Sequence, residues 1–213
     1  MSTLKTTNIT HGSNSGTANL ALASTGNVTV GADLIATKQN GCQRIVLEQF
    51  LSPCDGSVIA LQDGNHTMAN ITGSQVTTTT WTDITGSSIT YTPPTGTTQV
   101  IYEFNLPWAY ADPDYPIMGL KFFIDSDEVV YGRRNLSSTN AEELHVFKWA
   151  INIGGTASTN SGRLASWGSS KTLKMQCQEY SGSYEAKLFQ SNHHGSDSSD
   201  TLQVPLIGIT AIG

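Results

Sequence analysis

A short segment rich in aromatic, acidic and proline residues, 106–116, carries the side chains best suited to bind a ligand. It runs Leu-Pro-Trp-Ala-Tyr-Ala-Asp-Pro-Asp-Tyr-Pro. Aromatic rings stack on sugars or fill partner pockets, carboxylates accept hydrogen bonds from hydroxyl groups, and prolines lower the cost of ordering a loop. The candidate receptor-binding residues are Trp108, Tyr110, Asp112, Asp114 and Tyr115. The alternative is that Trp108 and Tyr110 have a structural role, in which they cap one end of a β-barrel or seal an interface between subunits.

Asp112 and Asp114 are also the carboxylate pair best placed to cleave a glycan, because glycosidases use two carboxylates about 5–10 Å apart. No recognised catalytic motif accompanies them. The sequence has no Gly-x-Ser-x-Gly turn, no phosphate-binding glycine loop with its lysine, and no His-Glu-x-x-His pair. We therefore expect no catalytic residues and no enzymatic activity, and we keep glycan binding or cleavage as a lesser alternative.

Two adjacent histidines, His193 and His194, are the strongest metal candidates, with carboxylates nearby in the same polar segment. Imidazoles and carboxylates bind Zn²⁺ or Ni²⁺. One pair lacks the ligand count of a closed site, although three subunits on a symmetry axis could each supply a histidine. A solvated hairpin loop is the favoured interpretation. The acidic run 125–128 lacks the glycine and later glutamate of a calcium loop, so we expect a plain turn there and neither metal nor cofactor.

The composition narrows the classes of partner. Charged residues make up 13 % of the 213 residues, about half the usual share, and Thr, Ser, Asn and Gly fill the deficit. The net charge is −6 and Arg133-Arg134 is the only basic cluster, which argues against nucleic-acid binding. No apolar run approaches the roughly 20 residues of a membrane helix. The start, residues 1–5, lacks the apolar core of a secretory signal, so we expect folding where the protein is made.

Three cysteines, Cys42, Cys54 and Cys177, have unrelated spacings. An odd count of this kind fits neither a disulfide framework nor a zinc site. Reduced, largely buried thiols are the favoured interpretation, and a single Cys42–Cys54 bridge is the alternative.

The first 40 residues differ from the rest, because small polar residues surround isolated apolar ones. Residues 20–22 and 28–30 are predicted as two short strands. A hairpin of this size is marginal in water on its own, so sister subunits or a larger assembly should hold it. We predict an attachment and oligomerisation arm over 1–40 and a sandwich domain over 41–213. The candidate attachment residues of the arm are Leu4, Ile9, Leu20, Leu22, Val28 and Val30.

Beyond residue 41 the pattern is one of short strands separated by Gly, Pro, Asn and Ser, with no convincing helix. Residues 184–190 are expected to pair with 171–180 across a tight turn, and Trp81, Trp149 and Trp167 are expected in the core or an interface. The spacing predicts an all-β fold, an antiparallel jelly-roll-like β-sandwich preceded by the extended arm. The expected strands are 45–51, 57–61, 76–81, 89–91, 99–106, 120–124, 128–131, 144–153, 171–180, 184–190 and 202–212.

Several stretches resemble virion structural and fibre-like proteins of marine bacteriophages, especially cyanophages. The similarity lies in 4–9, 20–22 and 26–31, and, nearer the C-terminus, in the segments 91–104 (Tyr-Thr-Pro-Pro-Thr-Gly-Thr-Thr-Gln-Val-Ile-Tyr-Glu-Phe), 121–127 (Lys-Phe-Phe-Ile-Asp-Ser-Asp) and 148–155 (Lys-Trp-Ala-Ile-Asn-Ile-Gly-Gly). The resemblance implies a particle protein that is located in the virion, is assembled in the host cytoplasm, and forms trimers as other jelly-roll appendages do.

The leading functional hypothesis is therefore a homotrimeric fibre or tail-appendage subunit that docks on other virion proteins through its arm and meets a host surface glycan with its outer loops. Trimer formation would follow from apolar burial between subunits. A capsid decoration protein that clamps neighbouring shell subunits is the alternative within the same class.

Overall fold

The computed structural model describes residues 8–9, 20–22, 28–29, 44–110, 115–138, 142–191 and 201–213. The chain divides into two compact units, Met1–Gln43 and Arg44–Gly213. Within the described residues no helix has the length and apolar character needed to cross a membrane. Each unit is described by itself below.

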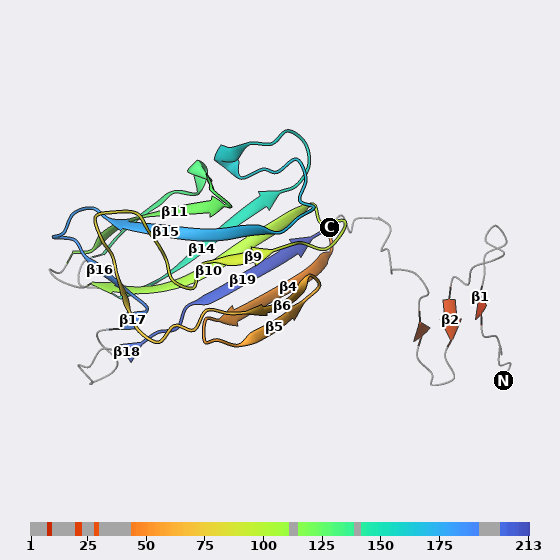
Figure 1. Ribbon diagram of the computed structural model, residues 1–213, viewed down its shortest axis with the longest axis horizontal. Helices are drawn as coiled ribbons and strands as arrows, with labels where there is room; N and C mark the ends of the chain where they lie inside the picture. The colour runs from red at the N-terminus through yellow and green to blue at the C-terminus, as the bar shows by residue number, and fades with distance from the viewer. Residues whose placement is uncertain are drawn as a thin grey trace. The chain divides into compact units, whose positions relative to one another are not determined.

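The first unit contains a small antiparallel sheet in the order β1-β2-β3 (Figure 1). Strands β2 (Leu20–Leu22) and β3 (Val28–Thr29) confirm the two strands that the sequence predicts, and β1 (Asn8–Ile9) adds a third. Of the six candidate attachment residues, Leu4 and Val30 lie outside the described residues, and the other four belong to these strands. Their role in attachment stays a prediction.

The second unit is an all-β sandwich of antiparallel strands, as the sequence predicts (Figure 1). The first sheet, called the β10 sheet, contains β4 (Val46–Pro53), β7 (Gln75–Val76), β10 (Gln99–Tyr110), β14 (Glu143–Asn152), β16 (Ala186–Leu188) and β19 (Leu206–Ile212). The second, called the β11 sheet, contains β8 (Thr82–Asp83), β9 (Ile89–Tyr91), β11 (Ile117–Ile124), β12 (Asp127–Glu128), β13 (Arg134–Ser137) and β15 (Lys171–Glu179).

Shorter elements connect and flank these sheets. They are the hairpin β5 (Val58–Leu61) and β6 (Gly64–Thr67), the pair β17 (Gln190–Ser191) and β18 (Thr201–Leu202), and the 3₁₀ turns η1 (Val130–Gly132) and η2 (Thr159–Ser161). From β10 onward, the long strands alternate between the β10 sheet and the β11 sheet along the chain, in the order β10, β11, β14, β15 and β19. This alternation is typical of jelly-roll-like sandwiches, in which the chain crosses repeatedly between layers.

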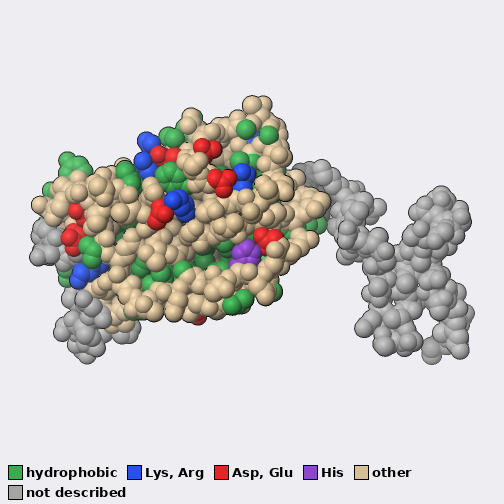
Figure 2. Space-filling view, in the orientation of Figure 1, with side chains coloured by type: hydrophobic (Ala, Val, Ile, Leu, Met, Phe, Trp, Pro, Cys, Tyr) green, Lys and Arg blue, Asp and Glu red, His purple; other side chains and the backbone are tan. Residues whose placement is uncertain are grey.

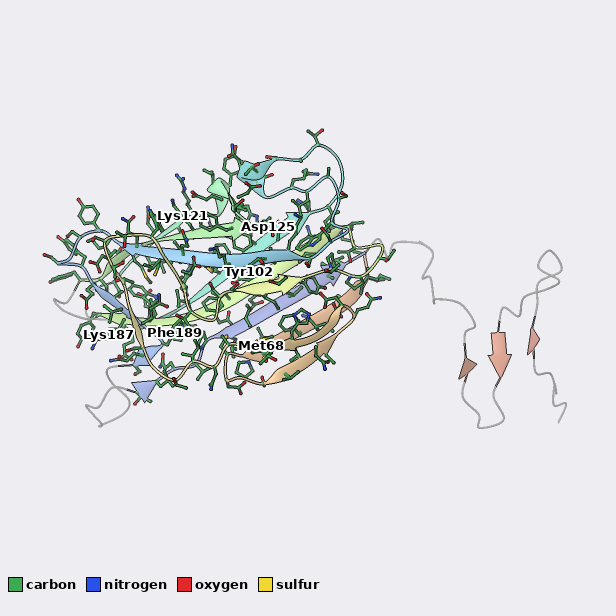
Figure 3. All side chains as sticks on the ribbon, in the orientation of Figure 1. Met68, Tyr102, Lys121, Asp125, Lys187 and Phe189 are labelled. Carbon is green, nitrogen blue, oxygen red and sulfur yellow. The ribbon has the colours of Figure 1, made fainter. Side chains whose placement is uncertain are left out.

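The core forms because the long strands alternate between buried and accessible side chains, so that one face of each sheet is apolar. At its centre Tyr102, Phe122 and Phe147 pack ring against ring, with centroid separations of 4.9 Å, 5.4 Å and 6.2 Å. Figure 3 shows Tyr102 within the layer of side chains between the sheets. Each such ring contributes about 1.5–3 kcal/mol through removal of apolar area from water.

Two predicted strands are wrong because the chain changes sheet within them. Residues 76–81 are not one strand: β7 ends at Val76 in the β10 sheet and β8 begins at Thr82 in the β11 sheet. Residues 184–190 do not pair with β15. Instead β16 pairs with β10 and β7, while β17 pairs with β18. Phe189, between β16 and β17, has a φ of 67° and a fully buried ring, so the turn there is fixed by packing rather than by a glycine.

Two boundaries also differ from the prediction. The strand expected at 128–131 is the two-residue β12, after which Val129 is buried and η1 begins. Residues 106–110, expected to belong to a loop, continue β10, because Trp108 pairs with both Glu143 and Leu188. Cys54 and Cys177 are buried free thiols, as predicted, and Cys42 lies outside the described residues.

Candidate functional site

The receptor-binding candidates of the sequence do not form a common surface in the described structure. Trp108 is only 1 % exposed and packs in the core, so its ring cannot stack on a ligand. Tyr110 is half-buried at the end of β10, and Tyr115 is exposed. Asp112 and Asp114 lie outside the described residues, as do His193 and His194.

The acidic run 125–128 is a turn whose carboxylates bind basic neighbours. Asp125 has a φ of 56° and its carboxylate accepts hydrogen bonds from Lys171 Nζ and the Thr172 amide, both at 2.9 Å. The hydrogen bond from Lys171 is the main reason that the pKa of Asp125 lies below its ordinary value. The turn therefore matches the plain structural interpretation. It closes the β11–β12 connection onto β15.

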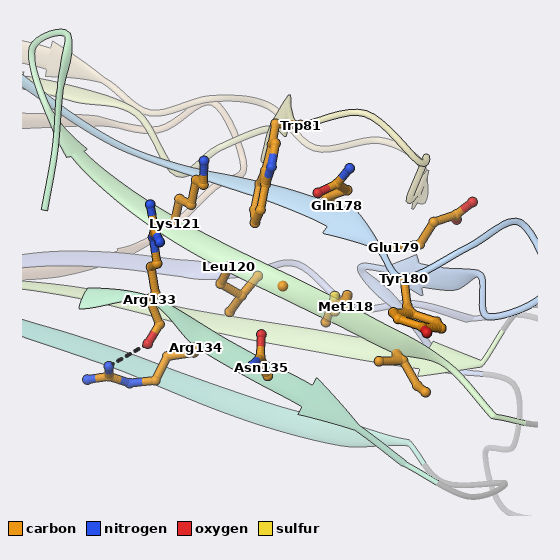
Figure 4. A pocket seen from close by; sticks show the side chains of 12 residues that line it. Trp81, Met118, Leu120, Lys121, Arg133, Arg134, Asn135, Gln178, Glu179 and Tyr180 are labelled. Carbon is orange, nitrogen blue, oxygen red and sulfur yellow. Dashed lines mark hydrogen bonds between the residues drawn. The ribbon is translucent and has the colours of Figure 1, made fainter. Parts of the chain in front are cut away.

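A trough lies on the outer face of the β11 sheet (Figure 4). It has a volume of about 560 Å³, and the residues that shape it are Trp81, Gly119, Lys121, Arg133, Asn135 and Tyr180. Strand β11 forms the floor, β13 one side, and β15 with Trp81 the other. The trough exists because Gly119 has no side chain at the position where its neighbours on β11 project outward.

Trp81 forms one wall of the trough, and two contacts fix the orientation of its indole ring. A Cβ on Gly119 would lie 2.9 Å from Trp81 Cη2, so the indole tip rests on the glycine. Lys121 Nζ lies 4.3 Å from the ring centroid, a cation–π geometry. Trp81, predicted to lie in the core or an interface, is 37 % exposed. It is therefore not a core residue, and its place in an interface stays a prediction.

Two basic side chains at one end of the trough share a single carboxylate. Glu128 accepts from Arg133 Nε at 2.5 Å and lies 3.2 Å from Lys121 Nζ. The hydrogen bond from Arg133, supported by Lys121, lowers the pKa of Glu128 below its ordinary value. The cluster therefore carries one net positive charge on a chain whose total charge is −6. Figure 2 shows one face of the molecule, on which acidic and basic side chains likewise lie next to each other among uncharged groups.

A second surface feature is the outer face of the β10 sheet. The strand registers place Leu51, Gly208, Glu103 and Lys148 side by side across β4, β19, β10 and β14. Apolar residues occupy most of the neighbouring positions on this face. The outward-facing apolar residues, called the apolar face, are Val46, Leu51, Pro53, Ile101, Pro107, Leu144, Val146, Ala150, Leu206 and Ile212.

The apolar face is accessible over much of its extent. Val46, Leu51, Leu144 and Val146 are all exposed, with fractions between 45 % and 61 %. At one end, a hollow of about 500 Å³ between β10, β14 and β19 is lined by Asn105 and Leu144 among others. Asn105 Oδ1 is buried there without a hydrogen-bond partner among the described residues. An unpaired buried oxygen costs about 1–3 kcal/mol.

Sequence reasoning missed both surfaces for identifiable reasons. The trough depends on Gly119 and Trp81, which are 38 positions apart in the numbering and meet only through the pairing of β8 and β11 with β15. In β14 the alternate face to Phe147 carries the apolar residues Leu144 and Val146. That second face was the available signal for an exposed apolar sheet.

No family model matches the chain, and no curated protein matches it. Among solved structures, the chain is similar to particles of infectious bursal disease virus. For the Gx strain the identity is 11 % over 78 % of this chain and 41 % of that chain, with a TM-score of 0.33. For the VP2 subviral particle the identity is 10 % over 74 % and 46 %, with a TM-score of 0.26. The chain spans less than half of the length of these structures, and a similarity this weak does not indicate a function.

Proposed function

We propose that the chain is a structural subunit of a virus particle, a homotrimeric phage fibre or tail-appendage subunit that associates with its own copies through the apolar face. The observation that carries this proposal is the exposure of Val46, Leu51, Leu144 and Val146 on one side of the sandwich. Contiguous exposed apolar surface is typical of interaction sites in otherwise soluble proteins. The proposed role needs no catalytic chemistry.

The charge of the apolar face favours a second copy of the same chain as its partner. Glu103 and Lys148 are cross-strand neighbours joined by an ion pair of 2.9 Å, and they are the charged side chains among the outward positions of the four registered strands. The outward positions of these four strands are therefore neutral in sum, and the acidic side chains Glu142 and Glu143 lie at the hollow at one end of the face, on a chain with a net charge of −6. Two copies repel each other least where they meet through a neutral surface.

The hollow at the end of the face supports the same proposal. Asn105 Oδ1 needs a donor that the described residues do not supply, and a backbone or side-chain N–H of a neighbouring copy would fill that need. Exposed Leu144 lies beside it and offers an apolar anchor. An interface core built from apolar side chains with a few satisfied polar groups is typical of homo-oligomers.

The arm over residues 1–40 is proposed to dock the oligomer on other virion proteins, and the surface away from the apolar face is proposed to meet the host. These two roles are proposed on the basis of the low charge content, the sandwich fold and the resemblance to marine phage proteins. Location within the virion and assembly in the host cytoplasm belong to the same proposal.

Association through the apolar face is tested by analytical ultracentrifugation of the full chain. The unmodified protein should sediment as a trimer, and Leu144→Asp combined with Val146→Asp should shift it to the monomer by placing charges in the interface. Val58→Asp is the matched control, because Val58 on β5 is 59 % exposed, close to the 61 % of Leu144, but lies outside the apolar face. A monomeric unmodified chain, or a double variant that remains trimeric, would count against the proposal.

Position on the particle is tested separately by immunogold labelling of purified virions. Label at the tail supports the appendage, and label over the shell supports capsid decoration instead. Absence of the chain from particles contradicts both. Release of reducing sugar from host polysaccharide by the purified protein would contradict a purely structural role.

A further inference from the structure

We infer that the trough on the β11 sheet binds an acidic saccharide, a sugar ring that carries a carboxylate or a sulfate group. The inference deepens the proposed function and rests on it for its biological setting, since that function brings the subunit to a host surface. The site differs from the 106–116 segment, because it lies on Trp81, β11, β13 and β15.

The size and floor of the trough suit a sugar. Its volume of about 560 Å³ falls within the range of roughly 300–1,000 Å³ that small-ligand sites occupy. Gly119 lets the indole tip of Trp81 lie directly on the floor of the trough, because a Cβ there would be 2.9 Å from Trp81 Cη2 and 3.7 Å from Asn135 Oδ1. Any side chain at this position would displace the Trp81 wall.

The walls combine aromatic surface with fixed geometry. Figure 4 shows the Trp81 indole nearly edge-on, with Lys121 on one side and Gln178 and Tyr180 on the other. Lys121 covers one ring face, and Gln178 and Tyr180 line the trough on the other side of the indole. Tyr180 is 74 % exposed, and its ring contacts Tyr184 edge-on at 5.6 Å. Rigid aromatic rings bury the apolar face of a sugar at small entropic cost.

Polar groups with spare hydrogen-bonding capacity line the same space. The side-chain amide of Asn135 faces the trough and makes no hydrogen bond within the described residues. Gln178 donates from Nε2 to the Thr79 carbonyl, which leaves its Oε1 as an acceptor. An unengaged amide can donate to one sugar hydroxyl and accept from another, because it has both functions.

The charge cluster at the end of the trough selects an acidic ring over a neutral one. Lys121 and Arg133 share Glu128, so one positive charge is left unbalanced. Arg133 uses Nε for Glu128 and keeps its two terminal nitrogens for a ligand, and these nitrogens match the oxygens of a carboxylate or sulfate. A single anionic group per sugar ring would balance the cluster.

The inference is tested by isothermal titration of the full chain with three probes of equal length: a uronic-acid hexamer, a sulfated hexamer and a neutral glucose hexamer. At least one acidic hexamer should bind about tenfold or more tightly than the neutral one, and its affinity should fall as salt is raised. Asn135→Ala and Arg133→Gln should each weaken that binding, Arg133→Gln by about tenfold because a charge-assisted hydrogen bond is lost.

Lys174→Gln is the control for Arg133→Gln. Each variant removes one positive charge that is paired with a carboxylate, Arg133 with Glu128 and Lys174 with Asp83, but Lys174 does not line the trough. Equal losses in the two variants would overturn the inference, as would a lack of binding by both acidic hexamers. Tighter binding of an aspartate hexapeptide than of either sugar would overturn it in favour of an acidic protein partner. None of these outcomes depends on where the subunit lies in a particle.

Discussion

The tip of the Trp81 indole packs directly against Gly119. On the opposite sheet, the backbone carbonyl oxygen of Phe50 approaches Gly208 equally closely. A Cβ on Gly119 would lie 2.9 Å from Trp81 Cη2, and a Cβ on Gly208 would lie 2.8 Å from the Phe50 oxygen. The distances are alike, but one neighbour is the end of a partly exposed side chain and the other is backbone within a strand pair. The two glycines should therefore differ in their tolerance of alanine.

Gly119→Ala should cost less than about 1 kcal/mol of the free energy of unfolding, because Trp81 can swing away and alanine suits a strand better than glycine. Gly208→Ala should cost about 1–3 kcal/mol, because β4 must shift from β19. Urea unfolding measures both values. Gly73→Ala is the control, since no atom lies within 4 Å of its added Cβ. Equal costs at positions 119 and 208 would contradict this ranking.

Ser87→Ala should destabilise the domain by about 1–3 kcal/mol, because it leaves a buried donor unpaired. The Ser87 hydroxyl donates to the Ile84 carbonyl at 2.7 Å and accepts from the Met175 amide at 3.0 Å. Both bonds are buried and join the 84–87 turn to β15. Ser88→Ala, at an exposed neighbour, should be close to neutral. Thermal and urea unfolding of the two variants measure how much the Ser87 hydrogen bonds contribute to the free energy of unfolding.

Glu48→Ala should loosen the β5–β6 hairpin without unfolding the sandwich. The Glu48 carboxylate accepts from the Gln62 amide at 2.6 Å and from the Tyr91 hydroxyl at 2.7 Å, so it connects β4 to the hairpin and to β9. Each lost bond contributes about 1 kcal/mol. Hydrogen exchange of residues 58–67 should accelerate at least about fivefold, while β10 stays protected. Gln49→Ala, at the next and exposed position, is the control that should leave exchange unchanged.

His145 should make the domain less stable as the solution becomes acidic. Burial, supported by the nearby Arg134, lowers the pKa of His145 below its ordinary value of 6.5. The unfolded chain therefore binds a proton more readily than the folded chain, and stability falls as the pH decreases from about 6.5 towards the lower folded pKa. Below the folded-state pKa of His145, its effect on the free energy of unfolding is complete and no longer changes with pH.

The check is a comparison of unfolding free energies at pH 7.5 and pH 5 for the unmodified chain and for His145→Gln. The difference between the two pH values should shrink in the variant, because its side chain does not titrate. An unchanged difference would assign the pH dependence to groups other than His145.

Much of the sandwich could be predicted from alternation alone. The period of two in β14 correctly placed Phe147 and Ile151 on a buried face, and the same pattern in β15 placed Leu173 and Met175 in the core. The errors fell where short segments change sheet. Local pattern does not specify that β16 pairs with β10 rather than β15, because a strand of three residues carries too little periodic information to select its partner.

The sequence by itself determined an all-β, lightly charged chain with two apolar-faced sheets, since side-chain period and composition are local properties. Only the tertiary structure decided which tryptophan is accessible. Trp108, a candidate binding residue in the sequence, is buried in the core, whereas Trp81, predicted in the core or an interface, is partly exposed and packs over Gly119. The physical reason is that periodicity states which side chains share a face, whereas exposure depends on what the rest of the chain places over that face.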